Sequence, residues 1–451
     1  MENKQNKLGT MPIGPLLVKM GVPMMVSMFV QALYNIVDSM FVARISENAL
    51  TAVSLAFPFQ LMMSSIAIGT GIGTNAFVSR TLGMQDIKGA EKAANVQCFL
   101  SFCYTVVFMI FGVLASHGFF AAQTDITEIV NLGTDYMTIV CMYCFGMFFA
   151  TNFEKLLVAL GSSAQSMISQ AAGAIFNIIF DWLLIFGIGP FPELGIKGAA
   201  IATVMGQFLS AVLAYYFVCR HSGGMKIRIR NMLPNMKTVK GIYAVGIPSA
   251  ITVGVVGVMS FFMNQILLTF STTATALFGI WGKLQSFGFM PVFGLNNGSV
   301  AIYSYNYGAG NLDRINKTKR LSIIMGLSVT TTVMLIYMLI PRTLLNMYDA
   351  SDYMMSIGVR AFRVCCLSMP FGALSVIVSN SFQSFGRSRF TLVVSLCRQV
   401  IILIPTAWLL SLSGRLELVW FAPVIAEAVT AVIAVVLEGN VRKMLNHKFK
   451  Q

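Results

Sequence analysis

The segment FNIIFDWLLIF, residues 176–186, contains one charged residue, Asp181, in a run that is otherwise apolar apart from Asn177. It lies inside a longer apolar run, residues 165–189. An apolar run of about 20 residues crosses the hydrocarbon core of a bilayer as a helix. A carboxylate at mid-membrane costs roughly 2.5–3.5 kcal/mol on insertion scales. The segment therefore predicts a transmembrane helix that carries a carboxylate in spite of its cost.

The whole chain has the composition of an integral membrane protein. Of its 451 residues, 56% are hydrophobic and 11% are charged, whereas about 25% of the residues in a soluble domain are charged. Run length, and the lack of ten-residue alternation, favour helices over a barrel. We predict an all-α membrane protein with twelve transmembrane helices. Their approximate limits are 16–43, 51–78, 95–121, 134–158, 165–189, 197–219, 242–269, 275–302, 320–341, 359–383, 390–412 and 416–438.

The distribution of Lys and Arg predicts the orientation of these helices. If both termini are cytoplasmic, 23 of the 31 basic residues lie on the cytoplasmic side and four on the outer side. Such a bias is typical of cytoplasmic loops in membrane proteins. We therefore expect a multi-pass protein of the cell membrane with both termini in the cytoplasm. The net charge of +14 then follows from topology and does not indicate a nucleic-acid partner.

The two halves of the chain share landmarks at one fixed offset, here called the repeat offset, which is the spacing from Gly21 to Gly246. GVP at Gly21 recurs as GIP at Gly246, and LGMQD around Gly83 recurs as YGAGN around Gly308. Each half has six spans, so both halves begin on the same side of the membrane. Parallel repeats of this kind are typical of transporters, with the substrate site between the halves. Further pairs at the repeat offset are Gln60 and Gln285, Gly69 and Gly294, Gly73 and Gly298, and Gly161 and Gly386.

The repeat predicts two six-helix bundles joined by a short connection. We expect an N-terminal lobe over residues 1–219, a basic cytoplasmic linker over 220–241 and a C-terminal lobe over 242–451. GTGIG, residues 69–73, is expected to loosen the second span. Pro291 with the following GLNNGS is expected to interrupt the eighth span.

The carboxylates inside the spans lie mainly in one half. Asp38 in the first span and Asp181 in the fifth lie at similar depth toward the outer side, and Glu154 lies near the cytoplasmic end of the fourth. Because fold geometry alone would not require acids in one lobe only, we infer a functional acidic cluster. At the repeat offset, the second half has Met263, Ser379 and Thr406 in place of these three acids.

The chemistry that fits this cluster is reversible protonation. Burial disfavours the charged form of a carboxyl group, and a second carboxylate nearby disfavours it further. Asn35 and Asn177 lie three and four residues before the two aspartates, on the same helix faces, and can orient them. The alternative for each amide is a bridge between helices, and for Glu154 an ion pair with Lys155. Other polar residues predicted to line the cavity are Gln31, Tyr34, Thr203 and Gln207.

The remaining polar residues and the cysteines form no arrangement that would indicate an enzyme active site. Lys283 and Arg398 are buried cations of the second half, which either pair with a carboxylate such as Glu427 or extend to the interface. Cys141 and Cys144 form a C-x-x-C inside an apolar run, so they are interpreted as ordinary apolar side chains. The three histidines lie in loops or at span ends. With no metal-ligand cluster and no nucleophile–base pair, we expect no metal, no cofactor and no enzyme.

Several motifs together resemble those of the multidrug and toxic compound extrusion (MATE) family, across essentially the whole chain. They are ALYNIVDSMFVARI (residues 32–45), SRTLGMQD (79–86), FNIIFDWLLIFG (176–187) and YNYGAGNLDRI (305–315). SFQSFGRSRFTLVVSLCRQVIILIP in spans 10 and 11 continues the match. The order of these motifs along twelve spans makes the resemblance specific.

The resemblance implies alternating access that exports organic cations against a proton or sodium gradient. In proton-coupled members, aspartates of spans 1 and 5 and a preceding asparagine line the cavity; they map onto Asp38, Asp181 and Asn177. A span 4 glutamate of one bacterial drug-pump branch maps onto Glu154. Some sodium-coupled members rely on a span 7 carboxylate, where this sequence has Asn264 and no acid. The lack of an acid in span 7 favours the proton as the coupling ion, while sodium binding at the N-terminal carboxylates remains an alternative.

These observations predict a multidrug efflux protein that uses inward proton movement through N-terminal carboxylates. The alternatives are sodium-coupled drug antiport and flipping of a lipid-linked saccharide. We expect small-molecule organic cations as substrates, the lipid bilayer as surroundings, a monomeric state and a contribution to antibiotic resistance.

Overall fold

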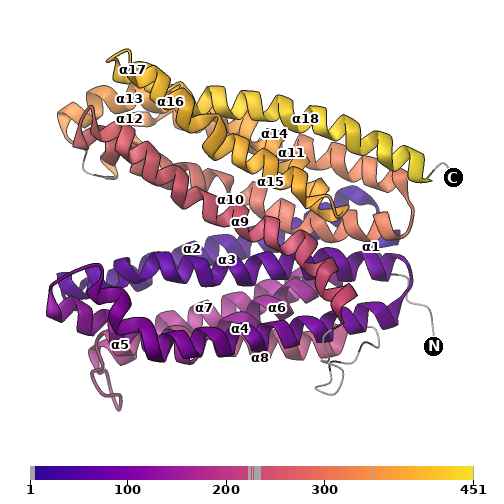
Figure 1. Ribbon diagram of the computed structural model, residues 1–451, viewed down its shortest axis with the longest axis horizontal. Helices are drawn as coiled ribbons and strands as arrows, with labels where there is room; N and C mark the ends of the chain where they lie inside the picture. Colours follow the sequence, from indigo (N-terminus) through magenta and orange to yellow (C-terminus); the bar gives the residue numbers. More distant parts are fainter. Residues whose placement is uncertain (1–5, 222–224, 226, 228–234, 349, 450–451) are drawn as a thin grey trace. The chain divides into compact units, whose positions relative to one another are not determined.

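The chain forms long α-helices in the computed structural model, which describes residues 6–221, 225, 227, 235–348 and 350–449 (Figure 1). This part of the chain contains no strand. The helices of the first half are α1 (Lys7–Thr10), α2 (Ile13–Ala43), α3 (Glu47–Gly83), α4 (Ile87–Ala121), α5 (Thr127–Met142), α6 (Phe145–Ala159), α7 (Ser163–Phe186) and α8 (Ile196–His221).

The second half repeats this series with more interruptions. Its helices are α9 (Met236–Leu268), α10 (Thr272–Gly308), α11 (Leu312–Leu339), α12 (Pro341–Asn346), α13 (Asp352–Cys366), α14 (Ser368–Ser384), α15 (Ser388–Leu396), the π-helix η2 (Cys397–Ile401), α16 (Leu403–Ser411), α17 (Leu416–Val419) and α18 (Ala422–Phe449).

The helices account for the predicted membrane spans. By length and composition, 10 of the described helical segments can cross a membrane, or 11 if α5 and α6, which are bent by 48°, form one span. The remaining predicted span corresponds to α10. This helix has 37 residues and includes polar side chains such as Lys283 and Asn297 that dilute its apolar run. Apolar side chains such as Leu114 and Leu339, 78% and 79% exposed, cover helix surfaces where lipid is expected.

The repeat offset is visible in the helix boundaries. Both ends of α10 follow the corresponding ends of α3 at this offset, and the segment from α15 to α16 covers the range of α7 in the same way. The turns also match, because Gly161 and Gly386 have φ of 78° and 74°, and Gln85 and Gly310 have φ of 62° and 73°. The internal repeat is therefore a repeat of local chain path as well as of sequence.

The chain divides into two compact units. The first comprises residues 1–10 and 26–250, and the second comprises residues 11–25 and 251–451. The lobe limits expected at 219 and 242 stay a prediction. Most of the expected linker, 220–241, lies outside the described residues; α8 ends at His221 and α9 begins at Met236.

Each unit has its own apolar core. In the first unit, the Phe59 ring stacks on Phe111 at 4.5 Å between centroids and packs edge-on against Phe108. In the second unit, Trp281 packs against Phe362 with ring centroids 5.8 Å apart. Aromatic pairs of this geometry contribute about 0.5–1.5 kcal/mol beyond the area they bury. The polar sites described below are therefore set in well-packed surroundings.

The expectation that Pro291 interrupts the eighth span is wrong, since α10 is continuous. The helix α3 also runs without a break through GTGIG, which was expected to loosen it. The glycines instead allow another helix to approach. A Cβ at Gly69 would lie 2.7 Å from the carbonyl oxygen of Gly246 on α9, and a Cβ at Gly294 would lie 2.6 Å from Cα of Met25 on α2. Small residues at helix contacts in membranes let backbones pack closely.

Removing the N-cap of α10 should lower stability. Ser271 has extended backbone angles, and its Oγ accepts the N–H of Ala274 at 3.0 Å. We expect Ser271→Ala to cost about 1 kcal/mol, measured as a lower midpoint of thermal unfolding in detergent. Ser54→Ala is the control, because the Ser54 hydroxyl bonds the Leu50 carbonyl within α3 and caps no helix end. Equal midpoints for both variants would contradict the capping role.

Candidate functional site

The site in the first unit begins with a close contact between α7 and α8. A Cβ at Gly173 would lie 2.6 Å from the carbonyl oxygen of Gly206, and a Cβ at Gly206 would lie 2.6 Å from that of Gly173. Only glycine fits at both positions without movement of a helix. One turn beyond, Asn177 Nδ2 donates a hydrogen bond to Thr203 Oγ1 at 3.3 Å, and both side chains are buried. The glycine contact thus brings the predicted amide of α7 onto a hydroxyl of α8.

Asp181 and Asp38 come together one further turn along α7. The Asp181 side chain is 0% exposed, and its carboxyl group lies within hydrogen-bonding reach of Asp38 on α2. Treated as carboxylates, they have three buried oxygens with no donor in good hydrogen-bonding geometry among the described residues: Oδ1 of Asp38 and both oxygens of Asp181. The Asn177 side chain lies close enough to Asp181 to interact with it. Two adjacent carboxylates repel each other, and burial without partners costs free energy. A proton or a bound cation would relieve both costs.

Two phenol groups surround this aspartate pair. The Tyr34 hydroxyl on α2 is a hydrogen-bonding neighbour of Thr203 and interacts electrostatically with both aspartates. The Tyr136 hydroxyl on α5 accepts a hydrogen bond from Gln60 Nε2 at 3.1 Å and is also within electrostatic range of the pair. Tyr34 was predicted from the sequence, whereas Tyr136 and Gln60 were missed as site residues. The sequence feature that could have indicated them is Gln60 itself, a polar residue in the apolar run LAFPFQLMM of the second span.

Glu154 forms a second polar group in the same unit. Its Oε1 on α6 accepts a hydrogen bond from Ser210 Oγ on α8 at 2.9 Å. Gln170 on α7 and the adjacent Lys155 also interact with it. The described residues show no direct contact between Glu154 and the aspartate pair. The three predicted acids therefore form a pair and a separate single carboxyl group.

Three further residues predicted to line the cavity show no contact with the aspartate pair among the described residues. Gln31 and Asn35 are exposed on α2, and within the described residues Asn35 makes no hydrogen bond to Asp38; its carbonyl accepts the Ser39 hydroxyl at 2.9 Å. Gln207 is half-buried on α8, where Gly146 of α6 packs closely against the backbone. The cavity-lining role of these three residues stays a prediction.

In the second unit, the structure shows Arg398 paired with Glu427, which is one of the two alternatives that the sequence left open. Arg398 Nε lies 2.6 Å from Glu427 Oε1, while Lys283 is exposed. Among the residues that the structure describes, no three His, Cys, Asp or Glu side chains converge as metal ligands would.

Curated proteins of similar sequence are transporters by name. Over 425 residues, the chain is 22% identical to "Multidrug export protein MepA" of Staphylococcus haemolyticus, covering 94% of this chain and 92% of that protein. It is 25% identical over 410 residues to the "FAD transporter" of Shewanella oneidensis, covering 88% of each.

Solved structures share the fold over almost the whole chain. "Crystal structure of MATE in complex with MaL6" superposes with a TM-score of 0.91 at 23% identity, covering 98% of this chain and 99% of that one. A transporter of the MOP superfamily from Pyrococcus furiosus gives a TM-score of 0.90 at 23% identity, covering 99% of each chain. The predicted fold class, twelve transmembrane helices in two repeated bundles, is confirmed.

The family assignment rests on a match in each half of the chain. The MatE family model matches residues 23–183 and 248–409. The two matches begin at the spacing that separates Gly21 from Gly246, which is the repeat offset seen in the sequence and in the helix boundaries. Because the two matches cover most of both bundles, the chain belongs to the MatE family, whose members are multi-pass membrane transporters and not enzymes.

Proposed function

We propose that the protein exports small organic molecules, organic cations among them, by alternating access, and that protons moving inward through the Asp38–Asp181 pair drive export. The observation that carries this proposal is the pair itself, with three buried carboxyl oxygens that have no donor in good hydrogen-bonding geometry within the described residues. The relatives named for multidrug export support a small-molecule substrate. The proposed location is the cell membrane, with both termini cytoplasmic and the monomer as the working unit.

The proposed cycle follows from electrostatics. A pair of adjacent buried carboxyl groups is neutralised by one proton together with either a second proton or a cationic substrate. Access from outside loads protons, and access from the cytoplasm admits the cation, which displaces a proton. Asn177, held by Thr203, and Tyr34 keep the pair oriented. Glu154 with Ser210 offers a second carboxyl contact for a positively charged group.

Sodium coupling is the second candidate, favoured by the same atoms. Hard cations prefer oxygen ligands, and the aspartate pair presents three unpartnered carboxyl oxygens together with the Tyr34 and Thr203 hydroxyls around it. Proton coupling is preferred because Asp181 is fully enclosed and because α9, which contains the seventh span, has no Asp or Glu.

The test is proton release from purified protein on substrate binding. Tetraphenylphosphonium is added to the protein in weakly buffered detergent solution containing choline in place of sodium, and a pH indicator reports the change. We expect acidification that saturates with the cation, because binding at the pair displaces a proton. Asp135→Asn is the control, since Asp135 forms an exposed ion pair with Lys197 at 3.2 Å, and its release should match wild type. Binding that needs sodium and releases no proton would favour the second candidate.

A further inference from the structure

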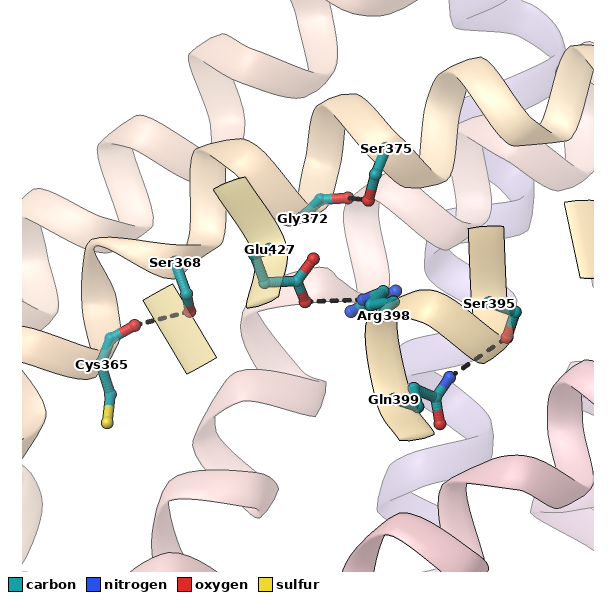
Figure 2. A network of polar contacts seen from close by, with 8 residues as sticks. All are labelled: Cys365, Ser368, Gly372, Ser375, Ser395, Arg398, Gln399 and Glu427. Carbon is teal, nitrogen blue, oxygen red and sulfur yellow. Dashed lines mark hydrogen bonds and ion pairs between the residues drawn. The ribbon is translucent and has the colours of Figure 1, made fainter. Parts of the chain in front are cut away.

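The second unit contains a buried ion pair that the proposed proton pathway does not use. Arg398 lies in η2, the five-residue π-helix between α15 and α16, and Glu427 lies on α18. Figure 2 shows the guanidinium directed at the carboxylate, with Nε 2.6 Å from Oε1. The Glu427 side chain is 7% exposed and the Arg398 side chain 19%. The carboxylate is thus enclosed, whereas the cation remains partly accessible.

The guanidinium is held in a defined orientation. Its carbon lies 5.7 Å from the ring centroid of Phe289, within range of a cation–π interaction. Gly372 on α14 leaves room for the carboxylate, because a Cβ there would lie 3.1 Å from Glu427 Cδ and Oε1 (Figure 2). An arginine fixed through Nε and one face loses little further freedom when its remaining donors bind a ligand.

The outer edge of the guanidinium has unused donors. Arginine has five N–H groups, and only Nε–H has a hydrogen-bond partner among the described residues. Neither Nη1 nor Nη2 is a buried atom without a partner, although Oε2 of Glu427 is. The pair is therefore joined at a single point, and the edge formed by Nη1 and Nη2 is open. Two parallel N–H groups of this kind match the oxygens of a carboxylate or a phosphate.

Neither the fold nor stability accounts for the pair. At the repeat offset, Arg398 corresponds to Gly173 and Glu427 to Ala202, so the first unit has small, uncharged residues at both positions. There, α7 runs without interruption where η2 breaks the second unit's helix. Short π-helical segments occur frequently at functional sites. Replacing a buried ion pair by apolar residues is often neutral or stabilising, so this pair calls for a role other than stability.

We propose that Arg398, positioned by Glu427 and Phe289, is an oxyanion-binding subsite of the second unit that recognises a carboxylate or phosphate group on the transported molecule. The subsite rests on the proposed function and adds to it a contact for the anionic group of a zwitterionic substrate. Glu427 is the positioning residue, because it fixes the guanidinium while leaving the two Nη groups for the ligand.

The test compares two forms of one rhodamine dye, the methyl ester, which is a cation, and the free acid, which is a zwitterion. Binding of each dye to the purified full-length protein is measured by fluorescence anisotropy. We expect Arg398→Gln to weaken binding of the acid by about tenfold or more, as loss of a bidentate charge-assisted contact predicts, and to leave the ester within about twofold of wild type. Arg360→Gln is the matched control, because it breaks an exposed Arg–Glu pair of the same length, 2.6 Å to Glu417.

A second variant separates loss of the subsite from misfolding caused by an unpaired buried carboxylate. Arg398→Gln leaves Glu427 buried without its partner, so the double variant Arg398→Met with Glu427→Leu replaces the whole pair by apolar side chains. We expect the same selective loss of the acid. An aminoalkyl carboxylate and an aminoalkyl phosphate, used as competitors of the acid, distinguish which oxyanion the subsite prefers.

Two results would overturn the proposal. One is an equal loss of both dyes in the folded double variant, which would make the pair structural. The other is unchanged binding of the acid in both variants. Because binding is measured on purified protein, the result is independent of proton coupling. A failure of the proposed transport function would appear instead as absent proton release with intact dye selectivity.

Discussion

Asp181→Asn abolishes uphill export while the variant still folds and reaches the membrane. Asparagine has nearly the shape of a protonated aspartate, so the fully enclosed position accepts it without a steric change. It carries no exchangeable charge, however, and the pair can no longer cycle between protonated and ionised states. Asp38→Asn has the same effect, because Asp38 is the other member of the pair.

The two variants should also be non-additive. Groups that act as one unit lose their function when either is removed, so the double variant is expected to be no worse than either single one. The measurement is accumulation of a fluorescent cation in proteoliposomes driven by a pH gradient, where the accumulation ratio should fall to unity. Asp135→Asn, at an exposed ion pair, should retain wild-type accumulation. Full accumulation in both single variants would exclude the aspartate pair as the coupling site.

Gly206→Val has the largest expected effect on folding. A Cβ at this position would lie 2.6 Å from the carbonyl oxygen of Gly173 and 3.0 Å from Cβ of Asn177. Backbone atoms cannot move aside as a flexible side chain can, so α7 and α8 must separate. Overpacking a core costs about 1–3 kcal/mol and occasionally more, and we expect at least the upper part of that range. Any folded fraction should also show weakened proton coupling, because Asn177 and Thr203 lie at the same contact.

The measurement is the yield of monodisperse protein in detergent and its midpoint of thermal unfolding. Gly118→Val in α4 is the matched control, since a Cβ at Gly118 has no neighbour within 4 Å. It should differ little from wild type. A midpoint for Gly206→Val close to that of the control would show that the two helices tolerate a wider spacing than the structure gives.

The single helices and their repetition could be predicted from the sequence because they depend only on the order of residues along the chain. Apolar run length predicts a span, and a fixed offset between landmarks predicts two bundles with the same chain path. Asp38 and Asp181 were predicted to be functional because each lies in an apolar run and has no acidic residue at the repeat offset in the other half. The pairing of Arg398 with Glu427 was among the alternatives considered, since a buried cation needs a counter-ion.

The errors come from properties that depend on how helices meet. Pro291 was expected to interrupt α10 and the glycines from Gly69 to Gly73 to loosen α3. Both helices are continuous, and Gly69 and Gly73 face neighbouring backbones instead. Asn35 shares the helix face of Asp38 in sequence, but it is exposed, and its carbonyl accepts a hydrogen bond from the Ser39 hydroxyl, so its cavity-lining role stays a prediction. Tyr136 was missed because nothing along α5 indicates that its hydroxyl meets Gln60.

The sequence by itself determined that this protein is an all-helical membrane protein, that its two halves repeat at one fixed offset, and that the carboxylates lie mainly in the first half. Only the tertiary structure decided that Asp38 and Asp181 form one pair, that Glu154 stands apart with Ser210, and that Arg398 keeps an open edge beside Glu427. The physical reason is that hydrophobicity and charge are properties of each residue. Hydrogen bonds and shared protons depend instead on the rotation and spacing of packed helices, which here are determined by contacts such as that between Gly173 and Gly206.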